Sequence, residues 1–225
     1  MNKSMLIIGA SRGIGAEVAK HFSNSGFRVI GVSRSHSKDC EWIEADITTS
    51  EGIDKITEVI GQTPIDALIY SSGVWEEKGF MEDFNFRETT VNETRHIMSV
   101  NLVAPIEITK AVSKNLSLTG NPRAIYLGAL SGTEQVASSQ VAYSASKFGL
   151  RGAVQSLRVA LKREKIGFTV INPGNVATEE VMMDIEAGHF PNQTPIPISD
   201  IISTIEFVLA TSNSVDVGDI NLMQK

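Results

Sequence analysis

The chain has 225 residues, of which 42% are hydrophobic and 20% are charged, a composition that is ordinary for a soluble globular protein. A formal net charge of −6 argues against nucleic acid or an anionic membrane as a partner, and a single cysteine excludes an internal disulfide. No apolar run approaches the ~18–20 residues of a membrane span, and none near the N-terminus suits a signal peptide, so we expect a cytoplasmic protein.

Short apolar segments alternate with segments of helical periodicity along the whole chain. The predicted strands are residues 5–8, 27–32, 42–44, 67–70, 124–127, 168–171 and 219–223. Apolar spacing predicts helices over residues 14–22, 53–60, 98–111, 143–161 and 201–209. Strands that are apolar throughout and that alternate with helices indicate a parallel sheet covered on both faces. The sequence therefore predicts an α/β fold in one domain, residues 1–225: a single Rossmann-type, doubly wound parallel sheet.

Two segments depart from this alternation. Residues 177–197 contain three prolines after Gly188, and we expect them to be irregular. Residues 75–95 are polar but carry four aromatic residues, Trp75, Phe80, Phe84 and Phe86. We expect both segments to form a lid or a substrate pocket, with local packing as the alternative for the aromatic residues.

A glycine-rich segment separates the first predicted strand from the first predicted helix. Glycine permits a tight turn and a close approach of the backbone to a pyrophosphate, and the free N–H groups at the start of a helix attract an anion. A purely structural turn is the alternative. The strand–turn–helix context favours a dinucleotide site. Its predicted contacts are Gly9, Ser11, Arg12, Gly13, Ile14 and Gly15.

The end of the second predicted strand bears on the choice of cofactor. It reads Ser33-Arg34, where a site that prefers a free ribose 2′-hydroxyl usually carries an acidic residue. Arg34 and Arg12 offer guanidinium groups, which bind a phosphate in bidentate fashion. A solvated loop charge is the alternative for Arg34. We therefore predict NADP(H) as the cofactor, with NAD(H) less favoured.

Tyr143 and Lys147 stand four residues apart within a predicted helix, which places their side chains on one face, one turn apart. A neighbouring ammonium favours the phenolate, so we expect the pKa of Tyr143 to fall from about 10 toward neutrality. Such a tyrosine can pass a proton to or from a substrate oxygen. An ordinary contact on an exposed helix face is the alternative for the isolated pair.

Together these motifs resemble the short-chain dehydrogenase/reductase family, and the resemblance covers nearly the whole chain. Further motifs match in order: Asp46-Ile47 after the third strand, Tyr70-Ser-Ser-Gly73 where the family usually has Asn-Asn-Ala-Gly, Asn101, and Pro173-Gly174 followed by Thr178. The resemblance implies further cofactor contacts at Asp46, Ile47, Ser72, Gly73, Asn101, Tyr143, Lys147, Pro173, Gly174, Val176 and Thr178.

The resemblance also implies an activity, in which a hydride passes between the nicotinamide and the carbonyl carbon of a small-molecule carbonyl or alcohol substrate. Tyr143 would supply or remove the proton of the oxygen, and Lys147 would tune Tyr143 and hold the ribose hydroxyls. Asn101 would anchor a water that relays protons; a polar residue that satisfies helix backbone is the alternative. By analogy, we expect a homodimer or homotetramer.

One motif departs from the family. The serine that the family carries 13 residues before the tyrosine falls on Leu130 by counting, or on Ala129 when residues 128–132 are aligned with the segment after the fifth strand. Ser131 is the nearest hydroxyl and is our candidate for the missing donor. The leading prediction is an NADP(H)-dependent carbonyl reductase or alcohol dehydrogenase. An NADP(H)-binding regulator or sensor with weak or no turnover is the alternative. No metal is predicted, because the four histidines show no ligand spacing.

Overall fold

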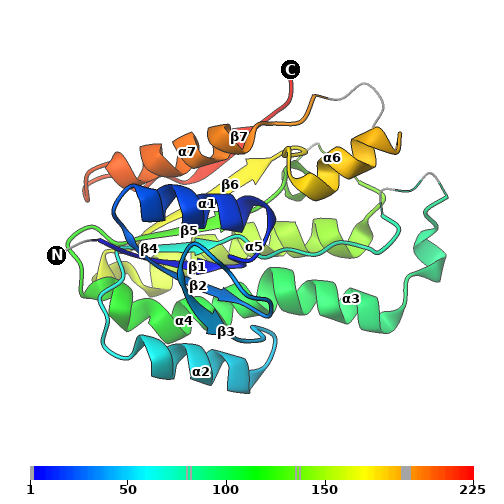
Figure 1. Ribbon diagram of the computed structural model, residues 1–225. Helices are drawn as coiled ribbons and strands as arrows, with labels where there is room; N and C mark the ends of the chain where they lie inside the picture. The colour runs from blue at the N-terminus through cyan, green and yellow to red at the C-terminus, as the bar shows by residue number, and fades with distance from the viewer. Residues whose placement is uncertain (1–2, 80, 82, 135, 137, 189–193) are drawn as a thin grey trace.

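The computed structural model describes residues 3–79, 81, 83–134, 136, 138–188 and 194–225. They form one parallel sheet in the order β3-β2-β1-β4-β5-β6-β7 (Figure 1). Its strands are β1 (Ser4–Ile8), β2 (Arg28–Ser33), β3 (Glu41–Glu44), β4 (Ala67–Tyr70), β5 (Arg123–Leu127), β6 (Gly167–Pro173) and β7 (Asp219–Leu222). Every neighbouring pair is parallel, so the predicted Rossmann-type sheet is confirmed.

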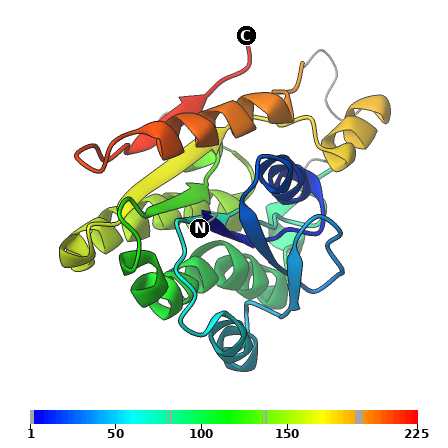
Figure 2. The same cartoon turned by 60° about the vertical axis from the view of Figure 1, so that its left-hand side comes forward.

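Helices cover both faces of this sheet. On one face lie α1 (Gly13–Asn24) and α7 (Ile198–Ala210); on the other lie α2 (Ser50–Ile60), α4 (Ala104–Ser117) and α5 (Val141–Ala160). Figure 2 shows the same separation from a second direction, with α7 (orange) on one side of the sheet and α2 and α4 (cyan and green) on the other.

The strand sequence explains the two layers of core. Along β1, Leu6 and Ile8 pack with the buried residues of α2, α4 and α5, whereas Met5 and Ile7 pack with those of α1 and α7. Successive side chains of a strand point to opposite faces, so a continuous apolar run supplies both layers. Among the described residues, no helix combines the length and the apolar character that crossing a membrane would require.

The strand order fixes where a ligand can bind. From β1 the chain moves outward to β2 and β3, then returns to place β4 on the other side of β1. In such sheets the loops diverge at the carboxyl ends of the two central strands, and this switch point leaves a crevice for ligands. Here the crevice begins at Gly9 after β1 and Ser71 after β4.

The helical segment observed around residues 98–111 is longer than the predicted helix and is interrupted by a different type of turn. The structure has α3 (Val91–Met98), a π-helical turn over Ser99–Val103, and then α4. Thr90 and Glu93 form a capping box that starts α3, and this signal lies inside the stretch that looked irregular. The π-helical turn contains Asn101, and such turns often occur at functional sites.

The expectation that residues 177–197 are irregular is wrong at α6 (Glu179–Glu186). Thr178 caps this helix by accepting a hydrogen bond from Val181 N at 3.3 Å, and Glu179 and Glu180 favour its first turn. The prolines that suggested irregularity all follow the helix. Short 3₁₀ turns occur at Phe86–Glu88, Leu130–Gly132 and Lys162–Glu164.

Candidate active site

A cavity of about 630 Å³ opens at the carboxyl ends of the strands. Its walls come from the loops after β1 to β6 and from α3, α5 and α6. All the predicted site residues line it except three, which are Gly15, Asn101 and Ser131.

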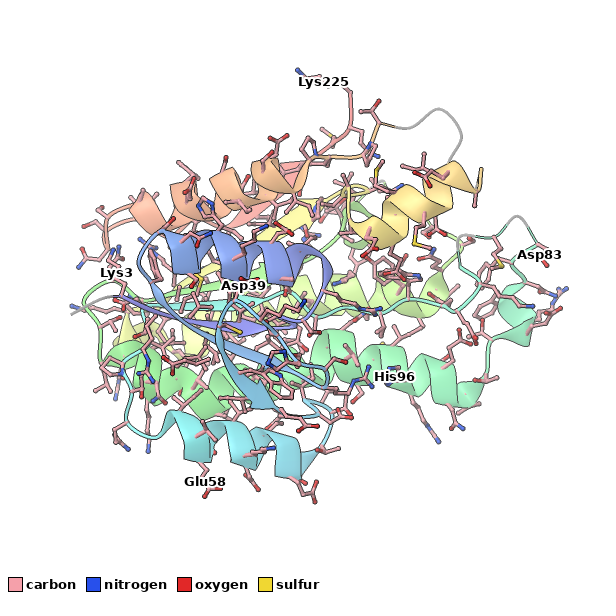
Figure 3. All side chains as sticks on the ribbon, viewed as in Figure 1. Lys3, Asp39, Glu58, Asp83, His96 and Lys225 are labelled. Carbon is pink, nitrogen blue, oxygen red and sulfur yellow. The ribbon has the colours of Figure 1, made fainter. Side chains whose placement is uncertain are left out.

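The segment between β4 and α3, which contains Trp75, extends beyond the sheet at the end where α6 lies, and Figure 3 shows Asp83 near the outer end of this segment. The aromatic Phe80 lies outside the described residues, Trp75 lines the cavity, and Phe86 is exposed.

The glycine loop is a close-fitting cradle. Gly9 has a φ of +92°, and a Cβ there would lie 2.6 Å from Ser72 Oγ. A Cβ on Gly15 would lie 2.0 Å from the carbonyl oxygen of Gly9, so Gly15 supports the loop from behind the cavity wall. The first turn of α1 has no acidic residue, and Arg12 makes no side-chain cap. The Cβ positions of Gly9 and Gly15 are thus taken up by neighbouring protein atoms, so both glycines allow the loop to pack closely. The free N–H groups of the first turn of α1 then suit a pyrophosphate.

The end of β2 carries the hydroxyl of Ser33 and the turn after it carries Arg34, and the glycine loop after β1 carries a second cation, Arg12. Ser33 Oγ donates to the carbonyl oxygen of Ser35 at 2.6 Å and accepts from Trp42 Nε1 at 3.1 Å. The Ser33 hydroxyl therefore has no proton left to give a ligand. Arg12 and Arg34 are exposed on the cavity wall, so both guanidinium groups can turn toward an anion.

Asp46 also lines this cavity, and its carboxyl is held in the anionic form. Thr48 lowers the pKa of the Asp46 carboxyl by donating from its hydroxyl at 2.6 Å and from its backbone N–H at 2.9 Å. The charges of Arg34 and His96 lower the pKa further. His96 was not predicted as a site residue; it reaches the cavity from α3, where Figure 3 labels it.

Tyr143 and Lys147 face the other end of the cavity from the first turns of α5. Lys147 is buried, and its Nζ donates to the carbonyl oxygen of Leu127 at 2.9 Å and lies 5.6 Å from the centroid of the Tyr143 ring. A Cβ on Gly73 would lie 3.4 Å from this Nζ. The turn after β4 thus passes within van der Waals contact of the lysine ammonium.

Asn101 lies behind this wall and is fully buried. Its Nδ2 donates to Val74 O at 2.7 Å and to Ser146 Oγ at 3.0 Å, and its Oδ1 accepts from Val74 N at 2.9 Å. These bonds use both amide protons and leave one lone pair of Oδ1. Asn101 therefore joins the turn after β4 to α5, and the predicted role in anchoring a water stays a prediction.

The pKa values of the central pair differ from the expectation drawn from the sequence. The pKa of Tyr143 is raised, first because the surrounding protein displaces water from the phenol and second because the Glu76 carboxylate is nearby. Burial lowers the pKa of the Lys147 ammonium to about 8. The expectation that the pKa of Tyr143 falls toward neutrality is wrong in this structure, because burial and the Glu76 carboxylate both raise it.

Ala129 rather than Ser131 lies on the cavity wall. Ser131 belongs to the 3₁₀ turn Leu130–Gly132, and its Oγ is buried without a hydrogen bond among the described residues. This turn packs against α5, since a Cβ on Gly132 would lie 2.6 Å from the Cβ of Lys147. The structure does not bring the Ser131 hydroxyl to the cavity that Tyr143 faces.

The two segments expected to form a lid or a substrate pocket, residues 75–95 and 177–197, both contribute to the cavity wall, and Asn175 lines it without having been predicted. Trp75 lines the cavity from the first segment, and α6 contributes Glu179, Glu180, Met183 and Asp184 from the second. The Thr178 cap could have revealed α6 before the structure did. No group of three His, Cys, Asp or Glu side chains that could hold a metal ion occurs in the described part of the chain.

Comparisons with known proteins agree with this geometry. Residues 3–187 match the family model described as short chain dehydrogenase. The 3-oxoacyl-[acyl-carrier-protein] reductase MabA of Mycobacterium bovis is 24% identical over 183 residues, covering 80% of this chain and 71% of that protein.

Two solved structures share the fold. The structure titled "ElxO with NADP Bound" has a TM-score of 0.83 at 17% identity and covers 99% of this chain and 98% of that one. That of 4-hydroxyisoleucine dehydrogenase complexed with NADH has a TM-score of 0.79 at 23% identity and covers 99% of this chain and 97% of that one. The family match spans most of the sequence, and the fold and the glycine cradle agree with it. The chain belongs to the short-chain dehydrogenase family.

Proposed function

We propose that the protein is an NADP(H)-dependent oxidoreductase that interconverts a small-molecule carbonyl and the corresponding alcohol, with Tyr143 as the general acid and base. The main support is that one cavity joins the glycine cradle to the side chains of Tyr143 and Lys147. A dinucleotide oxidoreductase needs an anion site and a proton donor within the span of one cofactor. Both features line this cavity.

The residues on the cavity wall fit a dinucleotide. Gly9 and Gly13 would hold the pyrophosphate at the start of α1, Asp46 and Ile47 would contact the adenosine, and Lys147 would hold the ribose beside the nicotinamide. Further contacts are proposed at Ser11, Ile14, Ser72, Gly73, Pro173, Gly174, Val176 and Thr178. When bound, the dinucleotide supplies or accepts the hydride.

A preference for NADP(H) is proposed from Arg12 and Arg34. Both residues are exposed on the cavity wall, Arg34 directly after β2, where a 2′-phosphate would need a cation, and Arg12 in the glycine loop. Among similar folds, ElxO has been solved with NADP and 4-hydroxyisoleucine dehydrogenase with NADH, so the fold accommodates either cofactor. The proposed preference for NADP(H) therefore rests on the positive charges of Arg12 and Arg34.

Tyr143 is proposed to protonate the substrate oxygen during reduction and to take the proton back during oxidation. Its raised pKa keeps the phenol protonated at neutral pH, which suits reduction. Lys147, with its pKa lowered to about 8, can gain and lose a proton near neutral pH. It is therefore proposed to help restore the proton of Tyr143.

A cofactor-binding regulator with weak turnover remains the second candidate because of Ala129. The methyl group of Ala129 lines the cavity where the family's serine hydroxyl is expected and cannot donate a hydrogen bond. Loss of one donor to a developing oxyanion can lower a rate by about 10²–10³, a figure from another enzyme class. Tyr143, Lys147 and Asn101 favour the enzyme.

A homodimer or homotetramer is proposed from exposed apolar side chains on α5 and the neighbouring π-helical turn. Phe148 is 43% exposed and Val103 is 51% exposed. Light scattering of the purified chain would test this, and a monomer at micromolar concentration would contradict it.

The experiment that tests the function has two steps. Fluorescence titration with NADPH measures binding, and a panel of aldehydes, ketones, quinones and pterins followed at the NADPH absorbance band measures turnover. Turnover that Tyr143→Phe abolishes while NADPH binding persists supports the enzyme. Tight NADPH binding with no turnover across the panel supports the regulator. If neither NADPH nor NADH binds in the same titration, both the enzyme and the regulator are excluded.

A further inference from the structure

Glu76 is an acidic residue with no exposed surface, and it contacts the helix that carries Tyr143. Its Oε1 accepts hydrogen bonds from Ala142 N at 2.8 Å and from Tyr143 N at 3.3 Å. It does not line the cavity but lies behind the wall, in the segment between β4 and α3. Charged residues are rarely buried so completely unless they are paired, so this contact requires an explanation.

The start of α5 explains why an acceptor is needed there. The first N–H groups of a helix have no partner within the helix, and the residue before the first turn usually supplies one from its side chain. Gln140 occupies that position and makes no such bond. Glu76 takes over this role from a distant part of the chain. A carboxylate also interacts favourably with the positive end of the helix dipole.

The segment that carries Glu76 is fixed on both sides. Val74 is held by the paired hydrogen bonds with Asn101, and the carbonyl oxygen of Glu76 accepts from Gly79 N at 2.8 Å. A Cβ on Gly79 would lie 2.8 Å from Gln140 Nε2, so this turn packs tightly against the start of α5. The Glu76 carboxylate therefore has one defined place beside the backbone of Tyr143.

We propose that Glu76 is a positioning residue for Tyr143: it holds the first turn of α5 from the facing segment and places a fixed negative charge behind the phenol. This inference rests on the proposed function, in which Tyr143 exchanges a proton with the substrate. The charge keeps that proton on the phenol, so the phenolate that oxidation of an alcohol needs forms only at higher pH.

The electrostatic surroundings support this role. Glu76 Oε2 accepts no hydrogen bond from the described residues, so its charge is poorly neutralised. Glu76 is the second cause, after burial, of the raised pKa of Tyr143. The other charged or titratable groups that line the same cavity as Tyr143 are Lys147 from α5, Glu179, Glu180 and Asp184 from α6, His96 from α3, and Arg12, Arg34 and Asp46 from the loops after β1, β2 and β3.

The test exchanges the carboxylate for an amide of nearly the same shape. Glu76→Gln keeps an oxygen that can accept from Ala142 N and Tyr143 N but removes the charge. Tyrosine ionisation, followed by ultraviolet absorbance against pH, reports the phenol directly. The chain has three tyrosines, and Tyr70 and Tyr126 are buried with raised pKa values. Subtracting the titration of Tyr143→Phe isolates the signal of Tyr143.

We expect Glu76→Gln to move the titration of Tyr143 to lower pH by about one unit, because a nearby anion opposes the phenolate. Oxidation of an alcohol needs the phenolate, so its rate against pH should rise at correspondingly lower pH in this variant. Glu77→Gln is the matched control. It makes the same change of charge on the adjacent residue, whose side chain is exposed, and both curves should stay within about 0.2 units of the unchanged protein.

Unchanged curves in a folded Glu76→Gln variant would overturn the proposal and leave Glu76 as a structural cap alone. Glu76→Asp is the second variant; it keeps the charge but withdraws it by one methylene, and we expect a smaller shift in the same direction. If neither variant folds, Glu76 is structural and the proposal is lost. The phenol titration needs no substrate, so it separates this inference from the proposed function, which fails if Tyr143→Phe retains full turnover.

Discussion

Asn101 and Val74 are joined by two hydrogen bonds in opposite directions, from Nδ2 to the Val74 carbonyl oxygen at 2.7 Å and from Val74 N to Oδ1 at 2.9 Å. The pairing fastens the turn after β4 to the π-helical turn between α3 and α4. Since Gly73 directly precedes Val74 and lies against Lys147, the position of the lysine depends on a residue that does not itself line the cavity.

Asn101→Ala should lower both stability and turnover. Two partly buried backbone groups of Val74 lose their partners, which costs at most about 1–3 kcal/mol for each, the value for a fully buried group left unsatisfied. Denaturant unfolding and kcat of the folded fraction measure the two effects. Asn115→Ala is the control, because Asn115 also bonds two backbone carbonyls, those of Gly61 and Thr63, but lies away from the cavity. It should lose stability and keep kcat; equal kcat in both variants would contradict the role of Asn101.

Tyr143→Phe should lower kcat by about 10²–10⁴, the usual contribution of general acid–base catalysis, while NADPH affinity changes little. Steady-state kinetics and fluorescence titration measure both. Tyr126→Phe removes a phenol whose oxygen lies 2.6 Å from Thr109 Oγ1 in the core, and should affect stability alone. Turnover that survives in Tyr143→Phe would argue against the proposed mechanism.

Arg34→Asp should shift cofactor preference toward NAD(H) by roughly 10-fold or more, since a hydrogen bond to a charged group contributes about 1.5–3 kcal/mol. The ratio of kcat/KM for NADPH and NADH measures this preference. Lys38→Asp makes the same change of charge at an exposed residue nearby that does not line the cavity, and should leave the ratio unchanged. The assignment of Arg34 fails if the two variants behave alike.

Gly15→Ala should weaken dinucleotide binding and lower the free energy of unfolding. The added Cβ would lie 2.0 Å from the carbonyl oxygen of Gly9, so the loop must move away from α1. Gly120→Ala is the contrasting substitution, because a Cβ there meets no atom within 4 Å and Gly120 lies before β5, away from the cavity. It should leave the free energy of unfolding and the affinity for NADPH nearly unchanged. Thermal unfolding with and without NADPH separates the loss of stability from the loss of dinucleotide binding. Similar results for the two variants would contradict the proposal that the glycine loop holds the pyrophosphate.

Ala129→Ser should raise the rate of ketone reduction, because it places a hydroxyl on the cavity wall where Ala129 now presents a methyl group. Ser131→Ala should leave the rate unchanged, since the Ser131 hydroxyl lies buried without a partner among the described residues. Parallel kinetics with one ketone decide between the two positions. A loss of turnover in Ser131→Ala would restore Ser131 as the missing donor.

The sequence by itself predicted the parts of this protein that depend on local pattern. Continuous apolar runs predicted the central strands, because strands covered on both faces are apolar on both sides, whereas the edge strands β3 and β7 mix polar and apolar residues. The order of the strands and helices, with the glycine segment after the first strand, located the crevice, and helical spacing placed Tyr143 and Lys147 on one face. The family resemblance supplied Asn101, whose place in a π-helical turn no local pattern indicated.

The tertiary structure decided what depends on residues far apart in the chain. Glu76 and Tyr143 are 67 positions apart, and their hydrogen bond exists only because the segment after β4 folds against α5. Burial raises the pKa of Tyr143, whereas the isolated Tyr143 and Lys147 pair predicted a lowered pKa. The sequence shows that a lysine stands four residues from the tyrosine, but only the fold shows that the surrounding protein removes water from the phenol. The position of Ser131 away from the cavity likewise follows from how its turn packs on α5. Periodicity is a local property, whereas solvation and burial are set by every element that surrounds a group.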